Sequence, residues 1–172
     1  MPVSISYTFF PLRPDLPPEG LDLKQMYEAR GGNPSKMMRV LEKTAVREKL
    51  PFGCLQRTYN SRMAQELGKW ADTKGRGERF HQAVYQAFFA DNLNIAHVDV
   101  LMSLVRAAGL PVEEAEAVYH ERRFRDAVDQ DWQRSSDMEI QVIPTYVANG
   151  RRLAGHQSIQ ALEGLLTVST LP

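Results

Sequence analysis

The dipeptide Asn149-Gly150, set between a β-rich run and a short partner run, is the sequence feature that most narrows the fold of this chain. Residues 141–148 are rich in β-branched and aromatic side chains, and residues 151–154 form a second short run. Two such runs separated by Asn-Gly are the strongest short-range signal of a β-hairpin, because both turn positions need a positive φ. We therefore predict two antiparallel strands here, followed by a closing helix that starts at Ser158.

The rest of the chain is predicted to be mostly helical. Residues 3–12 alternate apolar and polar side chains before a run of prolines, so we expect one strand there and no other in the first half. Aromatic stripes at helical spacing around Phe80, Phe88 and Trp132 are predicted to be core. The predicted helices, each bounded by a glycine, a proline or a capping residue, cover 21–30, 34–49, 61–70, 78–90, 100–108 and 111–132.

Charge and composition exclude several functions. Lys and Arg total 21 and Asp and Glu total 21, so the chain lacks the basic bias of a nucleic-acid binder. No basic segment followed by an apolar run opens the chain, and no stretch approaches the roughly 18 apolar residues of a membrane span. We expect a soluble, cytoplasmic protein without nucleic-acid or membrane partners. No metal site is predicted, because no pair of histidines has the four-residue step of a helical ligand pair among His81, His97, His120 and His156.

Cys54 is the only cysteine among the 172 residues. A single thiol excludes an intrachain disulfide, a Cys-x-x-Cys redox pair and a cysteine-based zinc site within this chain. Because Cys54 lies in the apolar stretch 50–55, we interpret it as a half-buried structural thiol, whose reactivity would require a lowered pKa. We assign no catalytic residue.

Two segments carry a resemblance to a known family. Residues 10–20 read Phe-Pro-Leu-Arg-Pro-Asp-Leu-Pro-Pro-Glu-Gly, and residues 142–151 read Val-Ile-Pro-Thr-Tyr-Val-Ala-Asn-Gly-Arg, followed at 154–157 by Ala-Gly-His-Gln. Together they resemble the FrnE-like subgroup of the DsbA-like thioredoxin-fold family, which is related to 2-hydroxychromene-2-carboxylate isomerase and the kappa-class glutathione transferases. The segment at 10–20 is similar to that subgroup's strand exit, and the segment from 142 onward is similar to its cis-proline strand, hairpin and final helix.

The resemblance implies a fold class and a domain division. We expect an α/β, thioredoxin-like fold, N-terminally truncated, with a large all-helical insertion between the first strand and the C-terminal β-hairpin plus helix. Residues 1–20 and 139–172 would form the thioredoxin-like portion, and residues 21–138 the helical insertion domain.

The resemblance also implies a missing part. In the family a strand leads into a Cys-x-x-Cys motif at a helix N-terminus, ahead of the strand expected at 3–12. We therefore expect a thiol–disulfide oxidoreductase homologue that is catalytically incomplete as this chain, through either a start codon assigned too far downstream or genuine loss. Without that central strand, backbone groups and apolar surface would be left uncovered. Three arrangements could cover them: direct pairing of the remaining strands, packing of the helices over them, or a partner chain such as a second copy.

The candidate site residues also come from the resemblance. It implies that the Ile143-Pro144 bond is cis and that Ile143, Pro144 and Thr145 line a cleft for a substrate peptide or thiol, whereas the residues alone favour a trans proline opening a strand. The glutathione-using relatives suggest three further residues, although two are plausible helix caps and one a plausible turn residue. These are Asn60, Gln157 and Ser158.

Two other functions fit the same sequence. The first is a non-catalytic thioredoxin-like module that binds a peptide or partner, with a homodimer covering the unpaired edge. The other is a glutathione-dependent isomerase or transferase relative, with glutathione as a co-substrate and no resident cofactor.

Overall fold

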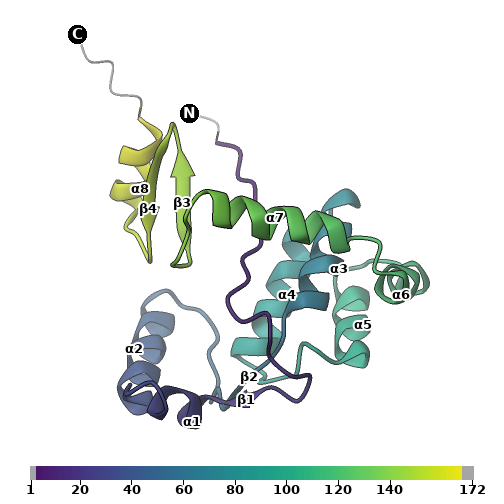
Figure 1. Cartoon of the computed structure of the whole chain (residues 1–172), viewed down its shortest axis with the longest axis horizontal. Helices are drawn as coiled ribbons and strands as arrows, with labels where there is room; N and C mark the ends of the chain where they lie inside the picture. The colour runs from purple at the N-terminus through teal and green to yellow at the C-terminus, as the bar shows by residue number, and fades with distance from the viewer. Residues whose placement is uncertain (1–2, 168–172) are drawn as a thin grey trace. The chain divides into compact units, whose positions relative to one another are not determined.

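The computed structural model describes residues 3–167 and is mostly helical with short strands (Figure 1). By its internal contacts the chain divides into two compact units, residues 11–129 and residues 1–10 together with 130–172. We call the first the helical unit and the second the hairpin unit. The domain boundaries expected from the sequence, at 20/21 and 138/139, stay a prediction.

The helical unit follows the predicted order of helices closely. The expected start of the second helix is confirmed, because the Asn33 side chain accepts a hydrogen bond from the Lys36 N–H at 2.9 Å and Pro34 follows it. The expectation of no other strand in the first half is wrong, because β1 (Leu21–Asp22) and β2 (Arg57–Thr58) pair there. Strands of two residues have no periodicity that the sequence could reveal. The elements are β1 (Leu21–Asp22), α1 (Leu23–Glu28), α2 (Pro34–Arg47), β2 (Arg57–Thr58), α3 (Arg62–Thr73), α4 (Gly77–Phe89), α5 (Val98–Ala107) and α6 (Val112–Glu121).

The core of the helical unit lies among α3, α4, α5 and α6. The predicted core position Phe80 is fully buried, and Phe88 packs against the same cluster. Burial of large apolar side chains is the main favourable term in folding, so this cluster holds the unit together. Its largest fully buried apolar members are Leu67, Trp70, Phe80, Leu101, Val105 and Val118.

The single long helix predicted for 111–132 is wrong. α6 ends at Glu121, its C-cap Arg122 has a left-handed φ of 54°, and a separate helix, α7 (Arg125–Asp137), follows. A non-glycine residue in this region costs about 1–2 kcal/mol. The local pattern does not reveal the break, because what holds Arg122 there is a pair of charge-assisted hydrogen bonds to Glu66 on α3.

The predicted hairpin and closing helix are confirmed in the hairpin unit. β3 (Thr145–Ala148) pairs antiparallel with β4 (Arg151–Ala154), and the turn residues Asn149 and Gly150 have φ values of 52° and 71°. Positive φ at both positions is the type I′ geometry that Asn-Gly favours. α8 (Ile159–Leu166) follows, and the Ser158 hydroxyl accepts a hydrogen bond from the third residue of the helix at 3.2 Å.

The strand predicted over residues 3–12 does not form, which corrects the expected fold class at that point. A strand needs a neighbour, and neither β3 nor β4 pairs with this segment within residues 3–167. Side chains of α7 satisfy the Phe9 backbone instead, since its N–H donates to Asp131 Oδ2 at 2.8 Å and its carbonyl accepts from the Ser135 hydroxyl at 3.4 Å. Val3 and Ile5 remain exposed.

None of the helices within residues 3–167 has the length and apolar character to cross a membrane. Cytoplasmic location stays a prediction.

Candidate functional site

The outer edge of β3 is the best candidate site, because it presents backbone groups that no strand uses. Ala148 and Arg151 flank the two-residue turn, and such a flanking pair exchanges hydrogen bonds across the hairpin. Pairs then alternate, which agrees with the hydrogen bond from the Gly155 N–H to the Pro144 carbonyl at 2.7 Å. The N–H and C=O groups of Thr145 and Val147 therefore point away from β4.

These outward groups have no backbone partner in the part of the chain that the structure describes. A bare strand edge is a template for pairing with an extended polypeptide, with one N–H and one C=O offered at every second residue. We call the segment from Val142 to Val147, with these outward groups, the β3 edge.

Apolar side chains accompany the β3 edge. Val142 is 52 % exposed, Ile143 43 % and Val147 48 %. Exposed apolar residues that occur singly are ordinary, but three within six positions beside unpaired backbone form a surface that another chain could cover.

Ile143, Pro144 and Thr145 lie together at the start of this edge, as the sequence analysis expected. The Ile143-Pro144 peptide bond is cis, as the resemblance implied. The Thr145 hydroxyl donates to the Val142 carbonyl, and the Pro144 carbonyl is bound by Gly155. The segment before β3 is therefore held by hydrogen bonds on both sides of the proline.

Gln157 and Ser158 lie just beyond β4, and both have local structural roles. The Gln157 side chain donates from Nε2 to the Ala154 carbonyl at 2.6 Å. Ser158 is the N-cap of α8, as its alternative interpretation held. Any role for these two residues toward glutathione stays a prediction.

One face of the hairpin is covered by α8. The Arg151 guanidinium donates from Nη2 to the carbonyls of Gly164, Leu165 and Thr167 at 2.6–2.8 Å, at the C-terminal end of α8. Since alternate residues share a face, Leu153 lies on the same side as Arg151. Val147 and its cross-strand partner lie on the opposite face and are exposed.

Asn60 belongs to the helical unit, where its side chain is fully used. Its Nδ2 group donates to the carbonyls of Pro14 and Leu16, both at 3.0 Å, and its Oδ1 accepts from the Arg62 N–H at 2.8 Å. The last bond gives Asn60 a capping role next to Ser61, at the start of α3. These contacts favour the structural interpretation of Asn60.

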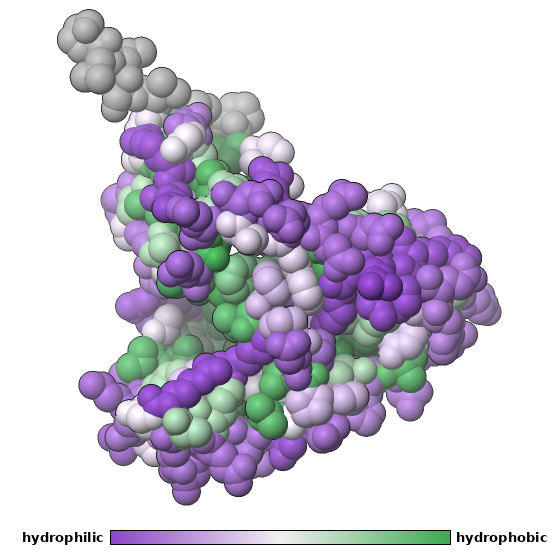
Figure 2. Space-filling view, viewed as in Figure 1, coloured by the Kyte–Doolittle hydropathy of each residue, from purple (hydrophilic) through white to green (hydrophobic). Residues whose placement is uncertain are grey.

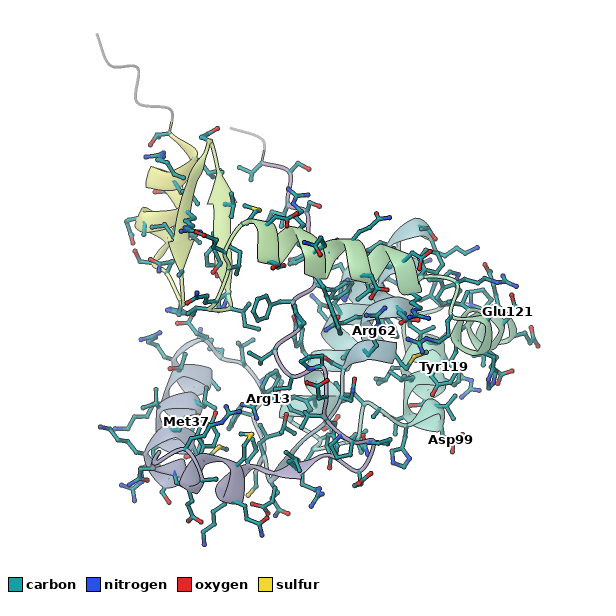
Figure 3. The ribbon with its side chains drawn as sticks, viewed as in Figure 1. Arg13, Met37, Arg62, Asp99, Tyr119 and Glu121 are labelled. Carbon is teal, nitrogen blue, oxygen red and sulfur yellow. The ribbon has the colours of Figure 1, made fainter. Side chains whose placement is uncertain are left out.

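An ionic cluster around the buried Glu66 in the helical unit was not predicted. Glu66 is 1 % exposed, and its carboxylate accepts hydrogen bonds from Arg62 at 2.6 Å and from Arg122 at 2.8 and 2.6 Å. Arg62, which is labelled in Figure 3, also bonds Asp129 at 2.6 Å. The i,i+4 spacing of Arg62 and Glu66 was the available signal.

The ionic cluster is electrostatically complementary. Burial by itself raises the pKa of Glu66, but the hydrogen bonds and charges of Arg122 and Arg62 outweigh it and lower that pKa below its usual value. The cluster connects α3 to the turn between α6 and α7. Both oxygens of the Glu66 carboxylate already accept hydrogen bonds within it.

Cys54 is exposed, which corrects the expected half-buried thiol. Its loop is fixed against the end of α4, since the Gly53 N–H donates to the Phe89 carbonyl at 2.8 Å. A Cβ at Gly53 would lie 2.1 Å from the Ala90 carbonyl oxygen, so only glycine fits there. The backbone is held by this contact while the thiol faces solvent. Among residues 3–167, no group of three or more metal-ligating side chains is assembled.

The chain matches a family and solved structures along most of its length. The family model described as DSBA-like thioredoxin domain matches residues 2–167. A solved structure described as a probable DsbA oxidoreductase from Streptomyces coelicolor aligns with a TM-score of 0.80 and 22 % identity, covering 94 % of this chain and 76 % of that one. At this identity the structural likeness concerns the fold alone.

Two curated relatives carry a different description. A ClpXP adapter protein SpxH from Halalkalibacterium halodurans is 28 % identical over 101 residues, which are 52 % of this chain and 33 % of that protein. A ClpXP adapter protein SpxH from Shouchella clausii is 32 % identical over 71 residues, 41 % of this chain and 24 % of that protein. The aligned part of this chain thus spans a third of the first adapter and about a quarter of the other.

Proposed function

This chain belongs to the family of DSBA-like thioredoxin domains, with a thioredoxin-like DsbA fold, and from that premise we propose that it is a thiol–disulfide oxidoreductase relative that works here as a binding module. It holds an extended polypeptide segment along the β3 edge and is catalytically incomplete as this 172-residue chain. The unpaired, outward-facing backbone of Thr145 and Val147 is the observation that carries the proposal.

The β3 edge supports binding of an extended segment through backbone hydrogen bonds. A peptide laid beside β3 would receive hydrogen bonds from Thr145 and Val147 and donate others to their carbonyls. The exposed side chains of Val142 and Ile143 would contact alternate side chains of that peptide. Backbone pairing reads little sequence, so we expect broad specificity with a preference for apolar residues.

One thiol does not support a dithiol catalytic cycle within the chain. Reducing a substrate disulfide takes two electrons, and a lone thiolate that attacks the disulfide forms a mixed disulfide and releases one substrate thiol. A second thiol must then attack that mixed disulfide, and the chain has only Cys54. Two relatives are named ClpXP adapter proteins, and an adapter role, like the binding role proposed here, requires no dithiol.

Peptide binding tests this proposal with matched proline variants. Fluorescence anisotropy would follow a labelled, carboxymethylated insulin B chain, which is unfolded and has no free thiol. Val147→Pro removes one outward N–H from β3 without breaking a hairpin hydrogen bond, and Ala154→Pro does the same on the outer edge of β4. We expect Val147→Pro to raise the Kd about fivefold, the value of one hydrogen bond, and Ala154→Pro to leave it unchanged.

The results distinguish peptide binding at the β3 edge from dimerisation through the same edge. Equal losses in the two variants, or no binding by the wild type, would contradict the proposal. A homodimer through the same edge predicts a doubled mass by light scattering that Val147→Pro returns to the monomer value.

A redox assay tests catalytic incompleteness separately. With dithiothreitol as reductant, the chain should reduce insulin no faster than the reagent alone. Activity above this blank that disappears in Cys54→Ala would show that Cys54 is a working redox thiol and that the incomplete-enzyme half of the proposal is wrong.

A further inference from the structure

α2 carries a row of cations along one exposed face. Lys36, Arg39, Lys43 and Arg47 follow one another at steps of three, four and four residues, which places them on one side of a helix. All four are exposed, and the opposite side of the helix bears its buried residue, Ala45. This arrangement contrasts with the zero net charge of the whole chain.

The cations of this face repel one another. Arg39 and Lys43, and likewise Lys43 and Arg47, are like-charge pairs at i,i+4, a spacing at which opposite charges stabilise a helix and like charges destabilise it. Arg47 forms an ion pair with Glu48 at 2.9 Å, whereas Lys36, Arg39 and Lys43 have no carboxylate partner within residues 3–167. The free chain therefore carries an unfavourable charge pattern that an anionic partner would relieve.

An apolar residue and a hollow lie within the same row. Val40 is 56 % exposed, one turn from Lys36, and Val46 beside the row is 78 % exposed. Figure 2 shows apolar residues interspersed with hydrophilic ones over the α1 and α2 region. A hollow of about 280 Å³ is lined by Asn33, Ser35, Lys36, Arg39, Val40 and Lys43.

We propose that this basic face of α2, meaning Lys36, Arg39, Val40, Lys43 and Arg47, docks an acidic segment of another protein. Complementary carboxylates would pair with the row of cations, and an apolar side chain of the segment would cover Val40. A membrane surface fits less well, since an interfacial helix needs a broad apolar face with large side chains, and here valine alone interrupts the charges. The site lies on α2 and is independent of the β3 edge.

The test is anisotropy with a fluorescein-labelled peptide in which glutamates at i and i+4 flank a leucine, measured on the full chain. The charge-reversed variant Arg39→Glu/Lys43→Glu is expected to weaken binding about tenfold or more. Binding by the wild type should also weaken steeply between about 50 and 300 mM salt. The variant is expected to stay folded, because Lys43→Glu replaces a like-charge contact with Arg47 by an attractive one.

The control carries the same charge change elsewhere. Arg79→Glu/Arg106→Glu reverses two exposed cations on α4 and α5 and should bind the peptide as the wild type does. A further variant, Val40→Ser, should weaken binding a few-fold without changing its salt dependence.

Each contrary result overturns the proposal. Absence of binding at low salt, or equal losses in both double variants, would exclude a docking face on α2. Binding of phosphatidylserine vesicles or duplex DNA at least as tightly as the acidic peptide would exclude the commitment to a protein segment.

Discussion

The helical unit and the hairpin unit differ in how much apolar surface each buries within itself. The helical unit buries Leu67, Phe80, Leu101 and Val105 completely in one cluster. In the hairpin unit Leu165 is the one buried apolar side chain among the residues described, and β3 keeps a bare edge. The helical unit has a large buried core, while the hairpin unit has little core of its own and leaves backbone groups of β3 unpaired among the residues described.

This difference indicates which substitutions should change stability and which should change binding. A unit with a closed core gains free energy from burial. A unit that leaves an edge uncovered is less stable alone but keeps groups that a partner can use. We therefore expect substitutions in the core of the helical unit to cost stability, and substitutions on the hairpin edge to cost binding.

The largest effect is expected from Phe80→Ala in the helical core. Removing a fully buried aromatic ring should lower the free energy of unfolding by about 3–5 kcal/mol, measured by urea unfolding followed by circular dichroism. The matched change on the hairpin unit, Ile159→Ala, removes a side chain that is 71 % exposed and should cost less than about 0.5 kcal/mol. Similar losses at the two positions would break the comparison.

Glu66→Gln should be the next most damaging. It leaves Arg62 and Arg122 beside a neutral amide, and since Arg122 is 42 % exposed and Arg62 keeps Asp129, the cost is expected to be about 2–3 kcal/mol, at or below the range for a fully buried ion pair. Urea unfolding at neutral pH measures this loss, and Lys24→Gln, an exposed charge on α1, is the control.

The same carboxylate makes stability depend on pH. Because the folded-state pKa of Glu66 lies below its ordinary value of 4.5, its contribution is fully present above that value and is lost as the pH falls through the folded-state pKa. The wild type should therefore lose stability below pH 4.5 more steeply than Glu66→Gln. Parallel pH profiles for the two proteins would show that the ionic cluster does not stabilise the fold.

Leu165→Ala tests whether the hairpin unit has a core of its own. The substitution should destabilise by about 2 kcal/mol. Hydrogen exchange should quicken in β3, β4 and α8, while the amides of α3 to α6 stay as protected as in the wild type. Faster exchange throughout the chain would mean that the two units unfold together.

The smallest expected effect is that of Arg151→Ala. The change removes the donor to three carbonyls at the end of α8 and should cost about 1 kcal/mol. Loss of helix signal with unchanged hydrogen exchange in α3 to α6 would localise the effect to α8. No loss would mean that solvent satisfies these carbonyls equally well.

The parts that the sequence predicted are those determined by neighbouring residues. The α2 start, the Asn149-Gly150 turn and the Ser158 cap depend on side chains within a few positions, and each is confirmed. The left-handed Arg122 was missed because its partner is 56 residues away, and the strand at 3–12 was wrongly predicted because alternation does not reveal whether a neighbouring strand exists.

The candidate site was predicted by a different route. Ile143, Pro144 and Thr145 were predicted from the family resemblance. From the residues alone, a proline at this position is expected to be trans and to begin a strand. The outward backbone of Thr145 and Val147 could be assigned only after the hairpin register was known. The basic row on α2 was not predicted, although the helix that carries it was; that three of its cations lack carboxylate partners within residues 3–167 could be known only from the structure.

The hairpin unit is assembled from both ends of the described chain, with the whole helical unit inserted between them. The hydrogen bond from Phe9 to Asp131 joins positions 122 residues apart. Contacts of such separation form slowly, whereas helices with local contacts form early. During synthesis the helical unit can fold as it emerges, while residues 3–10 must wait for α7 before their contacts exist. Chaperones would thus meet the N-terminal segment before its intramolecular partner is made.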